Sequence, residues 1–197
     1  MVSFDLTNSS YSQTQKEILE GAFRALRKAS YSEVSINDVG AEQGHSTGLI
    51  YYHFDDKDRL FLELATAMAA QLKDTLESIQ KESAKATLST IAYTVAVEDE
   101  DSQDFYTVLF DLRSQGFLRA EYREYAGEIS ASILTSITTV VQDCTDHKDS
   151  SDATAKLTGL LLQRLECQLL FDSRIEEALE AEIQRTIEAL TEPSKTN

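Results

Sequence analysis

Residues 35–54 read Ser-Ile-Asn-Asp-Val-Gly-Ala-Glu-Gln-Gly-His-Ser-Thr-Gly-Leu-Ile-Tyr-Tyr-His-Phe, and this stretch decides how the rest of the chain is interpreted. Ser35 is a favourable N-cap for a first short helix with an apolar side. Gly44 interrupts the pattern, and Ser46 offers the N-cap of a second helix that runs through Tyr52. A helix, a tight glycine turn and a second short helix together predict a helix-turn-helix.

The outward side of the second predicted helix carries hydroxyls, an imidazole and one apolar side chain. Such groups suit phosphates, base edges and thymine methyls in a DNA major groove. A lysine in the first turn of the following helix slightly opposes the helix dipole, which fits a phosphate contact, although a solvated surface lysine is the alternative. The predicted DNA contacts are Ser35, Ser46, Thr47, Leu49, Tyr51, Tyr52, His53 and Lys57.

The sequence from Ile18 to Leu60 resembles the DNA-binding domain of the TetR/AcrR family of transcriptional regulators. The resemblance is carried by residues 18–23, Tyr31 and residues 34–54, and a Gly-x-x-Tyr-x-His-Phe run followed by Lys57 is its specific signature. It implies a homodimer that binds a palindromic DNA operator, with a small-molecule effector that releases the operator. Residues 61–197 fit the family only in helical character and length.

Three positions depart from the family pattern. His45 stands where a small apolar residue usually packs under the recognition helix, and Thr47 stands where lysine is frequent. Ser30 replaces a common glycine before Tyr31. We expect His45 either to cost packing or to lie at the edge with a ring nitrogen on a backbone group, and Thr47 to remove a phosphate contact.

Composition predicts an all-α protein, because the 197 residues include one proline and seven glycines. We expect an N-terminal three-helix helix-turn-helix DNA-binding domain over residues 1–55 and a C-terminal helical ligand-binding and dimerisation domain over residues 56–197.

The sequence contains no run of eighteen apolar residues, so no membrane contact is expected. The first residues lack a secretory signal pattern, which predicts a cytoplasmic protein. Cys144 and Cys167 have no partner at metal-ligand spacing, so no metal or cofactor is expected.

The net charge of −16 is unusual for a protein predicted to bind a polyanion. Residues 1–60 contain six lysines and arginines against nine acids, so most of the negative charge lies in residues 61–197. A uniformly acidic surface is typical of a salt-rich cytoplasm, where screening weakens repulsion from DNA. We interpret the chain as halophilic, with an ordinary acidic protein as the alternative. So few cations predict a shallow dependence of DNA affinity on salt.

Helical periodicity continues through the chain. Ser12 or Thr14 can cap a helix that runs to about Ala29, and Asp56 caps a long helix with leucines at four-residue spacing. Further helices are predicted at residues 84–97, 103–115, 118–143, 152–172 and 174–191, with the acidic run 98–101 as one separator. Helix 152–172 is apolar on more than one face, and helix 174–191 carries a second apolar stripe. These two helices are the predicted dimer interface, with a monomer that has a thick core as the alternative.

Aromatic and polar side chains on the central helices fit a small-molecule pocket, although an ordinary helical core has the same composition. Arg113 and Arg164 need partners on these largely apolar helices, either a ligand carboxylate or one of Glu166, Asp111 and Glu121. The predicted pocket residues are Tyr93, Tyr106, Phe110, Arg113, Phe117, Tyr125, Arg164 and Gln168.

An enzyme is not expected, because the sequence lacks His-Glu-x-x-His, Glu-x-x-His, Gly-x-Ser-x-Gly and glycine-rich phosphate motifs. A helical dimeric sensor or protein-interaction module that has lost DNA binding is the remaining alternative, and Thr47 in place of lysine favours it.

Overall fold

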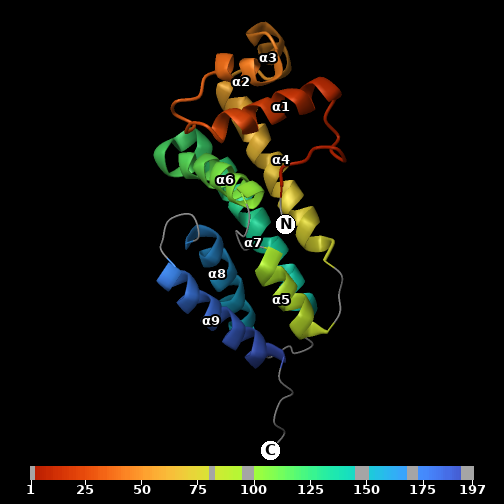
Figure 1. The fold of residues 1–197 in the computed structure, drawn as a ribbon, viewed down its shortest axis with the longest axis vertical. Helices are drawn as coiled ribbons and strands as arrows, with labels where there is room; N and C mark the ends of the chain where they lie inside the picture. Colours follow the sequence, from red (N-terminus) through yellow and green to blue (C-terminus); the bar gives the residue numbers. More distant parts are fainter. Residues whose placement is uncertain (1–2, 80–82, 95–99, 145–150, 168–172, 192–197) are drawn as a thin grey trace, which may run out of the picture.

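The computed structural model describes residues 3–79, 83–94, 100–144, 151–167 and 173–191. Figure 1 shows a small helical head at one end, a pair of helices at the other and a long helix that joins the head to the body. The described residues form helices and no strands, which confirms the all-α prediction. The elements are α1 (Gln13–Leu26), α2 (Ile36–Gln43), α3 (Thr47–His53), α4 (Lys57–Glu77), α5 (Ala84–Thr94), α6 (Glu100–Leu118), the 3-10 helix η1 (Ala120–Tyr122), α7 (Arg123–Cys144), α8 (Ser151–Cys167) and α9 (Ser173–Thr191).

Side-chain caps begin the first four helices. Ser12, rather than Thr14, caps α1 and forms a capping box with Gln15. Ser35, Ser46 and Asp56 cap α2, α3 and α4 by accepting hydrogen bonds from backbone amides in the first turn. Each cap satisfies a backbone donor that the helix itself leaves unpaired, which stabilises the helix by about 1 kcal/mol.

Several predicted boundaries are wrong. The helix predicted to end at residue 115 continues to Leu118, and the helix predicted to begin at residue 118 begins at Arg123, after η1. Helix α1 ends at Leu26 and does not reach Ala29. Helix α6 begins at Glu100, inside the acidic run that was predicted to separate two helices. Acidic side chains in a first turn interact favourably with the positive end of the helix dipole, so Glu100 and Asp101 are compatible with the start of a helix.

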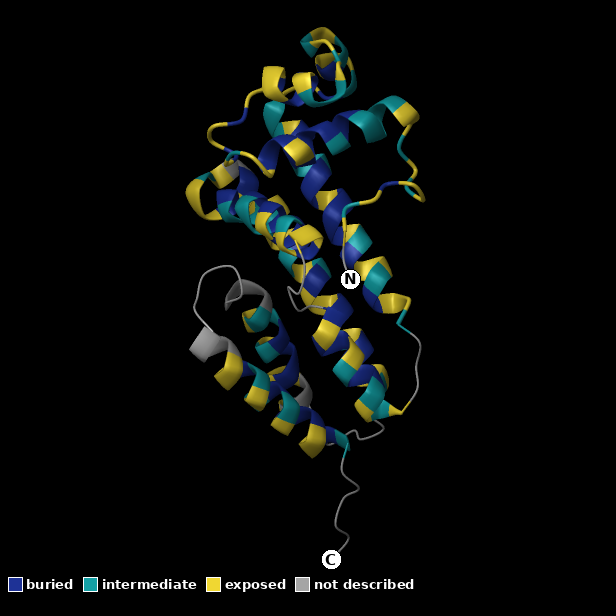
Figure 2. Cartoon of the chain, viewed as in Figure 1, coloured by how far each residue is buried: buried dark blue, intermediate teal, exposed yellow. Residues whose placement is uncertain are grey.

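Helix α4 connects the head to the body through a continuous buried stripe. Its 21 residues span about 31 Å at 1.5 Å per residue. Leu60, Phe61 and Leu64 lie in its first turns, and Leu72 and Leu76 near its far end; all are almost fully buried. Figure 2 shows this buried stripe running the length of α4 and into α1. The hydrophobic core therefore continues across the predicted domain boundary between residues 55 and 56. That boundary stays a prediction.

The N-terminal segment before α1 packs along α4. Leu6 is 3% exposed, and the ring of Phe4 lies 4.8 Å from that of Phe23. The backbone amide of Asp5 donates to Gln71 Oε1 at 3.0 Å, and Tyr11 Oη donates to Glu63 Oε2 at 3.0 Å. Burial, together with the Glu63 carboxylate, raises the pKa of Tyr11 to about 12. Sequence periodicity gives no sign of this packing, because the segment is not helical.

Helices α8 and α9 pack against each other at the end of the molecule remote from the head (Figure 1). Their buried residues face the protein's own core: Leu157, Leu161, Leu179, Ile183, Ile187 and Leu190. Leu160 and Leu162 of α8 are only partly buried. Leu169 and Leu170, which contribute to the predicted apolar character, lie outside the described residues. Among the helices that the structure describes, none has the length and apolar character needed to cross a membrane.

Candidate nucleic-acid interface

The turn between α2 and α3 is held by a close backbone approach. Gly44 ends α2 with φ of 72°, a conformation that favours glycine. The amide of His45 donates to the carbonyl of Gly40 at 2.9 Å. A Cβ atom on Gly40 would lie 2.5 Å from the His45 carbonyl oxygen, so only glycine fits there without a shift. Ile50 is fully buried and anchors α3 to the head.

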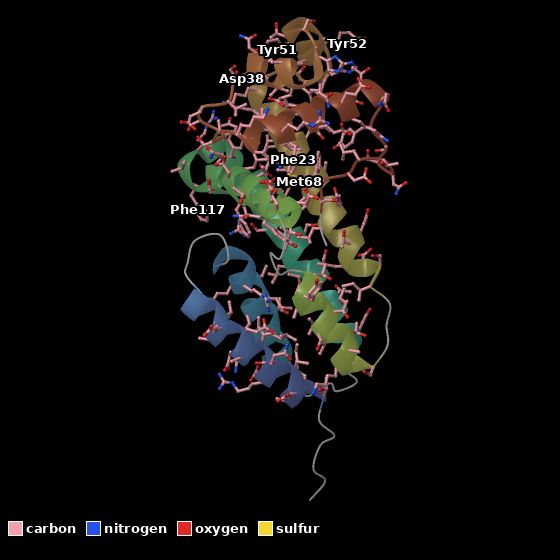
Figure 3. The ribbon with its side chains drawn as sticks, in the orientation of Figure 1. Phe23, Asp38, Tyr51, Tyr52, Met68 and Phe117 are labelled. Carbon is pink, nitrogen blue, oxygen red and sulfur yellow. The ribbon has the colours of Figure 1, made fainter. Side chains whose placement is uncertain are left out.

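The outer face of α3 carries the predicted DNA contacts. Figure 3 shows Tyr51 and Tyr52 at the end of the molecule farthest from the body. Tyr52 is 83% exposed and Tyr51 50% exposed. The rings of Tyr52 and His53 meet edge to face, with centroids 5.1 Å apart. Exposed aromatic side chains in a short helix contribute little to folding, so this face is available for recognition.

The remaining predicted contacts on α2 and α3 are less exposed or already engaged. Ser46 is exposed, but its hydroxyl accepts a hydrogen bond from the Leu49 amide as the cap of α3, and Thr47 and Leu49 are partly buried. Ser35 is exposed, but its hydroxyl donates to Asp38 Oδ2 at 2.6 Å. Hydrogen bonds from the Ser35 side chain and backbone lower the pKa of Asp38. A carboxylate therefore lies at the start of α2.

His45 occupies an edge position, as one of the two expectations had it, but its partner differs from the prediction. Its Nε2 atom lies 3.1 Å from Glu17 Oε2 on α1 and not on a backbone group. The imidazole is only 18% exposed, so it fills space at the junction of α1 with the turn while its polar edge is satisfied. This contact explains how the head accommodates a histidine where a small apolar residue is usual.

Lys57 is engaged inside the protein. Its Nζ atom donates to the carbonyl of Tyr31 at 2.6 Å and lies 4.4 Å from the centre of the Tyr31 ring. Burial lowers the pKa of Lys57. The lysine predicted as a phosphate contact thus fixes the loop between α1 and α2, and a DNA contact by Lys57 stays a prediction.

All the other lysines and arginines of the head also have partners. Lys16 donates to the carbonyl of Thr7 at 2.9 Å. The arginines and Lys28 pair with acids of the head, of α4 or of α6: Arg24 with Glu20, Arg27 with Asp104, Lys28 with Glu42 and Arg59 with Glu63. Lys16, Arg27 and Lys28, which could have contacted phosphates, are therefore held by protein groups.

A polar junction joins the head to the body, and sequence reasoning missed it. The hydroxyl of Tyr31 lies 2.8 Å from that of Tyr122 and accepts a hydrogen bond from Arg119 Nη1 at 2.9 Å. It also donates to Asp58, and Arg119 Nη2 donates to the same carboxylate at 2.9 Å. The backbone amide of Tyr31 donates to Asp111 Oδ2 at 2.7 Å.

Electrostatics hold this junction in a single protonation state. Burial alone would raise the pKa of Asp58, but hydrogen bonds from Tyr122, Tyr31 and Arg119 outweigh it, so the pKa of this carboxyl lies below its ordinary value. Burial and the hydrogen bond to Asp58 raise the pKa of Tyr31. The carboxylate is therefore charged and the tyrosine neutral. No local sequence signal indicated Arg119, because its partners Tyr31 and Asp58 lie 88 and 61 positions away in the chain.

The structure distributes the predicted pocket residues over several sites. Tyr93 is 58% exposed, whereas Tyr106 is fully buried and donates to the Thr94 carbonyl at 3.2 Å. Arg164 pairs with Glu180 of α9, an acid that was not among the predicted partners. Gln168 lies outside the described residues.

The other members of that set lie on α6 and α7. The guanidinium of Arg113 lies 4.6 Å from the centre of the Phe110 ring. Phe117 is 81% exposed and Tyr125 37% exposed. Arg113 and Phe117 both line one cavity of about 400 Å³ at the corner of α6 and α7.

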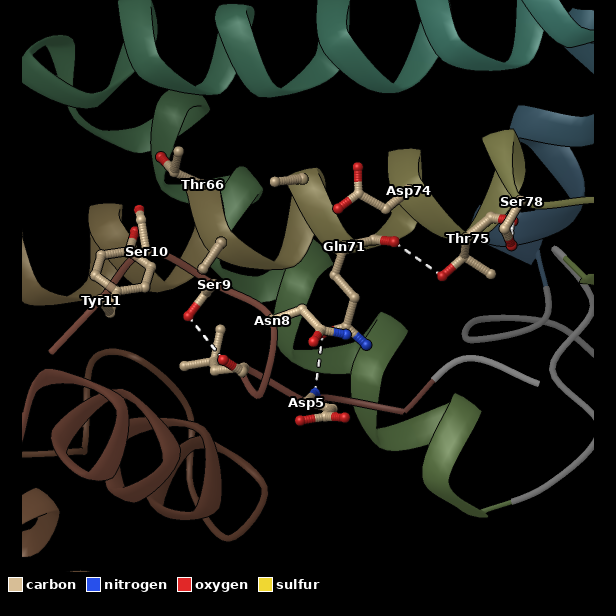
Figure 4. Close-up of a pocket in the computed structure, with 13 residues that line it drawn as sticks. Asp5, Asn8, Ser9, Ser10, Tyr11, Thr66, Gln71, Asp74, Thr75 and Ser78 are labelled. Atoms are coloured by element: carbon tan, nitrogen blue, oxygen red, sulfur yellow. Dashed lines mark hydrogen bonds between the residues drawn. The ribbon is translucent and has the colours of Figure 1, made fainter. Parts of the chain in front are cut away.

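A second cavity, of about 530 Å³, lies between the N-terminal segment and α4 (Figure 4). Two carboxylates, Asp5 and Asp74, and several hydroxyls line it. The Gln71 amide at its centre already holds the N-terminal segment, because it accepts from the Asp5 amide and donates to the Ser3 carbonyl. None of the predicted ligand residues lines this cavity.

Comparison with known proteins connects this geometry to a family. Residues 18–64 match the sequence model of bacterial regulatory proteins of the tetR family. The head is therefore a tetR-family helix-turn-helix, and the match contains the whole of α2 and α3.

Two curated relatives of the head are transcriptional repressors by name. The HTH-type transcriptional repressor AcnR of Corynebacterium diphtheriae is 35% identical over 71 residues, which cover 36% of this chain and 37% of that protein. AcnR of Corynebacterium efficiens is 38% identical over 63 residues, which cover 32% of this chain and 34% of that protein. The matched segment thus spans little more than a third of these relatives.

Solved structures share the fold over most of the chain. A TetR transcription regulator from Haloarcula marismortui aligns with a TM-score of 0.69 at 20% identity and covers 92% of this chain and 100% of that one. A tetR-family regulator from Rhodococcus sp. aligns with a TM-score of 0.71 at 17% identity over 92% of this chain and 100% of that one. The body as well as the head therefore shares the fold of these structures.

Proposed function

We propose that this protein is a cytoplasmic DNA-binding transcriptional repressor that binds a palindromic operator as a homodimer and releases it in response to a small molecule. The observation that carries the proposal is the tetR-family head, whose recognition helix α3 presents Tyr51 and Tyr52 outward from a rigid turn. The named repressor function of relatives of this head supports it.

Contacts in this proposal rest on neutral donors rather than on cations. The lysines and arginines of the head are paired with protein groups, several of them at the surface, whereas the α3 face offers hydroxyls and an imidazole. Hydrogen bonds to phosphates and bases from such groups release few counterions. Specific binding would then persist at high salt, which fits the proposed halophilic source of this acidic chain.

The proposed dimer uses α8 and α9. Leu160 and Leu162 of α8 remain partly exposed on a helix pair whose other leucines and isoleucines are buried. A two-fold dimer through this helix pair would present two heads, whose recognition helices could enter successive major grooves of the operator.

A DNA titration tests the function. Fluorescence anisotropy with a duplex from the region upstream of the protein's own gene would be recorded at low and at molar salt. Tyr51→Ala should weaken binding by about tenfold or more, because a lost base or phosphate contact costs about 1–3 kcal/mol. Tyr93→Ala removes a tyrosine of α5 that is 58% exposed, against 50% for Tyr51, and serves as the matched control.

We expect specific binding with a log–log salt slope of at most about two, because each neutralised phosphate adds about 0.9. A steep slope would place cations in the interface after all. Absence of specific binding at every salt concentration would reject the repressor and favour a sensor or interaction module that has lost DNA binding.

A further inference from the structure

The corner between α6 and α7 differs in charge from the rest of the molecule. The chain has a net charge of −16, yet residues 113–123 contain three arginines and a single acid. Arg119 is held by Asp58 in the head–body junction. Arg113, which also stacks on the Phe110 ring, and Arg123 line the cavity of about 400 Å³ at this corner. The described residues give Arg123 no ion pair, and its side chain is exposed.

Apart from Ser130, the remaining residues that line this cavity are apolar or lack a side chain. The ring of Phe117, which is 81% exposed, lines it together with Gly116 and Ala126. Gly116 lets the two helices approach closely, because a Cβ atom there would lie 2.3 Å from that of Ala126. The adjacent Leu118 is 77% exposed, so Phe117 and Leu118 together leave apolar surface at this corner that a ligand would cover. A cavity with apolar walls and two guanidinium groups matches an apolar body that carries an anionic group.

From this geometry we infer that the α6–α7 corner is a binding site for small organic carboxylates with an apolar body, and that its occupancy alters the orientation of the DNA-binding head. The guanidinium groups of Arg113 and Arg123 receive the carboxylate, which suits their paired donors. Phe117 covers the apolar body of the ligand. The inference about the head rests on the proposed function, whereas binding at the corner does not.

The cavity is connected to the junction that holds the head through η1 and the first residue of α7. Arg123 directly follows Tyr122, whose buried hydroxyl meets Tyr31 of the head at 2.8 Å. The carbonyl of Tyr122 also lies 3.4 Å from the Cβ position of Gly116 in the cavity wall. If a ligand displaced η1, it would therefore change the contact between the hydroxyls of Tyr122 and Tyr31.

The junction in turn lies close to the recognition helix. Asp58, which binds both Tyr31 and Arg119, is in the first turn of α4. Helix α4 begins four residues after the end of α3. A ligand that binds with different affinity to two orientations of this junction would shift the population of head positions.

Isothermal titration calorimetry with benzoate tests the site without DNA. Benzyl alcohol supplies the apolar body without the charge, and sulfate supplies an anion without the apolar body. We expect benzoate to bind more tightly than either probe. Arg123→Gln should weaken it by about tenfold or more, because a hydrogen bond to a charged group is lost. Arg185→Gln removes an exposed arginine of α9 and is the matched control.

DNA titration with and without benzoate tests the coupling. Benzoate should change the operator affinity of the unaltered protein, and Arg123→Gln should abolish that response. Tyr122→Phe should keep benzoate binding but reduce the response, because it removes only the hydroxyl that meets Tyr31.

The possible results separate the claims. No benzoate binding, or binding that Arg123→Gln leaves unchanged, would overturn the site. Binding at the corner without any effect on operator affinity would overturn the coupling. Failure to bind DNA even without benzoate would overturn the proposed function and with it the coupling, while the calorimetry still decides the site.

Discussion

At the scale of single residues, Tyr31 makes the most connections between the head and the body. Its amide, carbonyl and hydroxyl contact Asp111, Lys57 and Tyr122 respectively, and the hydroxyl also meets Asp58 and Arg119. Buried polar networks of this kind are costly to leave half satisfied. The junction is therefore sensitive to the loss of one atom.

Tyr31→Phe should lower the free energy of unfolding by about 1–3 kcal/mol, because it leaves partly buried hydrogen-bonding groups without their partner. Urea denaturation followed by circular dichroism measures this loss. Tyr52→Phe removes the same atom from a side chain that is 83% exposed and should change stability by less than about 0.5 kcal/mol. Equal losses in the two variants would show that the junction contributes nothing.

Asp58 should make part of the free energy of unfolding depend on pH in the acidic range. Its pKa lies below the ordinary value of 3.8, so its contribution is fully present above pH 3.8 and is lost as the pH falls through the lower, folded-state pKa. The difference in unfolding free energy between the unaltered protein and Asp58→Asn should therefore be constant near neutrality and shrink below pH 3.8. The exposed Asp55→Asn is the control. A difference that grows on acidification would contradict this assignment.

At the scale of elements, the recognition helix depends on how closely α2 approaches the turn that precedes it. Two glycines of the head differ sharply in their surroundings. A Cβ atom on Gly40 would meet the His45 carbonyl at 2.5 Å, whereas on Gly48 the nearest atom is Ser46 Oγ at 4.0 Å. The first glycine is required by packing, and the second lies in a helix where it has no such role.

Gly40→Ala should destabilise the protein by about 1–3 kcal/mol, because the turn must shift to admit the methyl group. Gly48→Ala should instead stabilise it by about 0.5–1 kcal/mol, because alanine restricts the unfolded chain and favours the helix. Thermal and urea unfolding of both variants measure the contrast. Changes of the same sign would show that the close approach does not constrain the turn.

At the scale of the whole molecule, assembly determines whether two heads can read one operator. The proposed interface places partly exposed leucines of α8 against a second copy. Leu160→Glu should shift the protein from dimer to monomer, because a buried carboxylate without a partner is unfavourable. Sedimentation over a range of concentrations measures this change, with circular dichroism to verify folding.

Leu134→Glu is the matched control, since Leu134 is 44% exposed on α7, outside the proposed interface. A dimer that survives Leu160→Glu would reject the α8–α9 interface. Dissociation caused by Leu134→Glu instead would place the interface on α7.

The sequence by itself determined the helices of the head and the turn between them. Ser12, Ser35, Ser46 and Asp56 act on amides within one turn of themselves, and Gly44 acts on its own backbone. Such effects depend on the nearest residues, so periodicity and caps suffice to predict them. The outward placement of Tyr51 and Tyr52 followed from the same short-range pattern.

Only the tertiary structure decided the partners of the charged and polar side chains. Tyr31 meets Tyr122 across 91 positions of the chain, and Arg119 meets Asp58 across 61. Lys57 was expected at a phosphate or in solvent but donates to the Tyr31 carbonyl, and Arg164 pairs with Glu180, which was not among its predicted partners. No local pattern specifies contacts over such separations, because they depend on how whole helices pack.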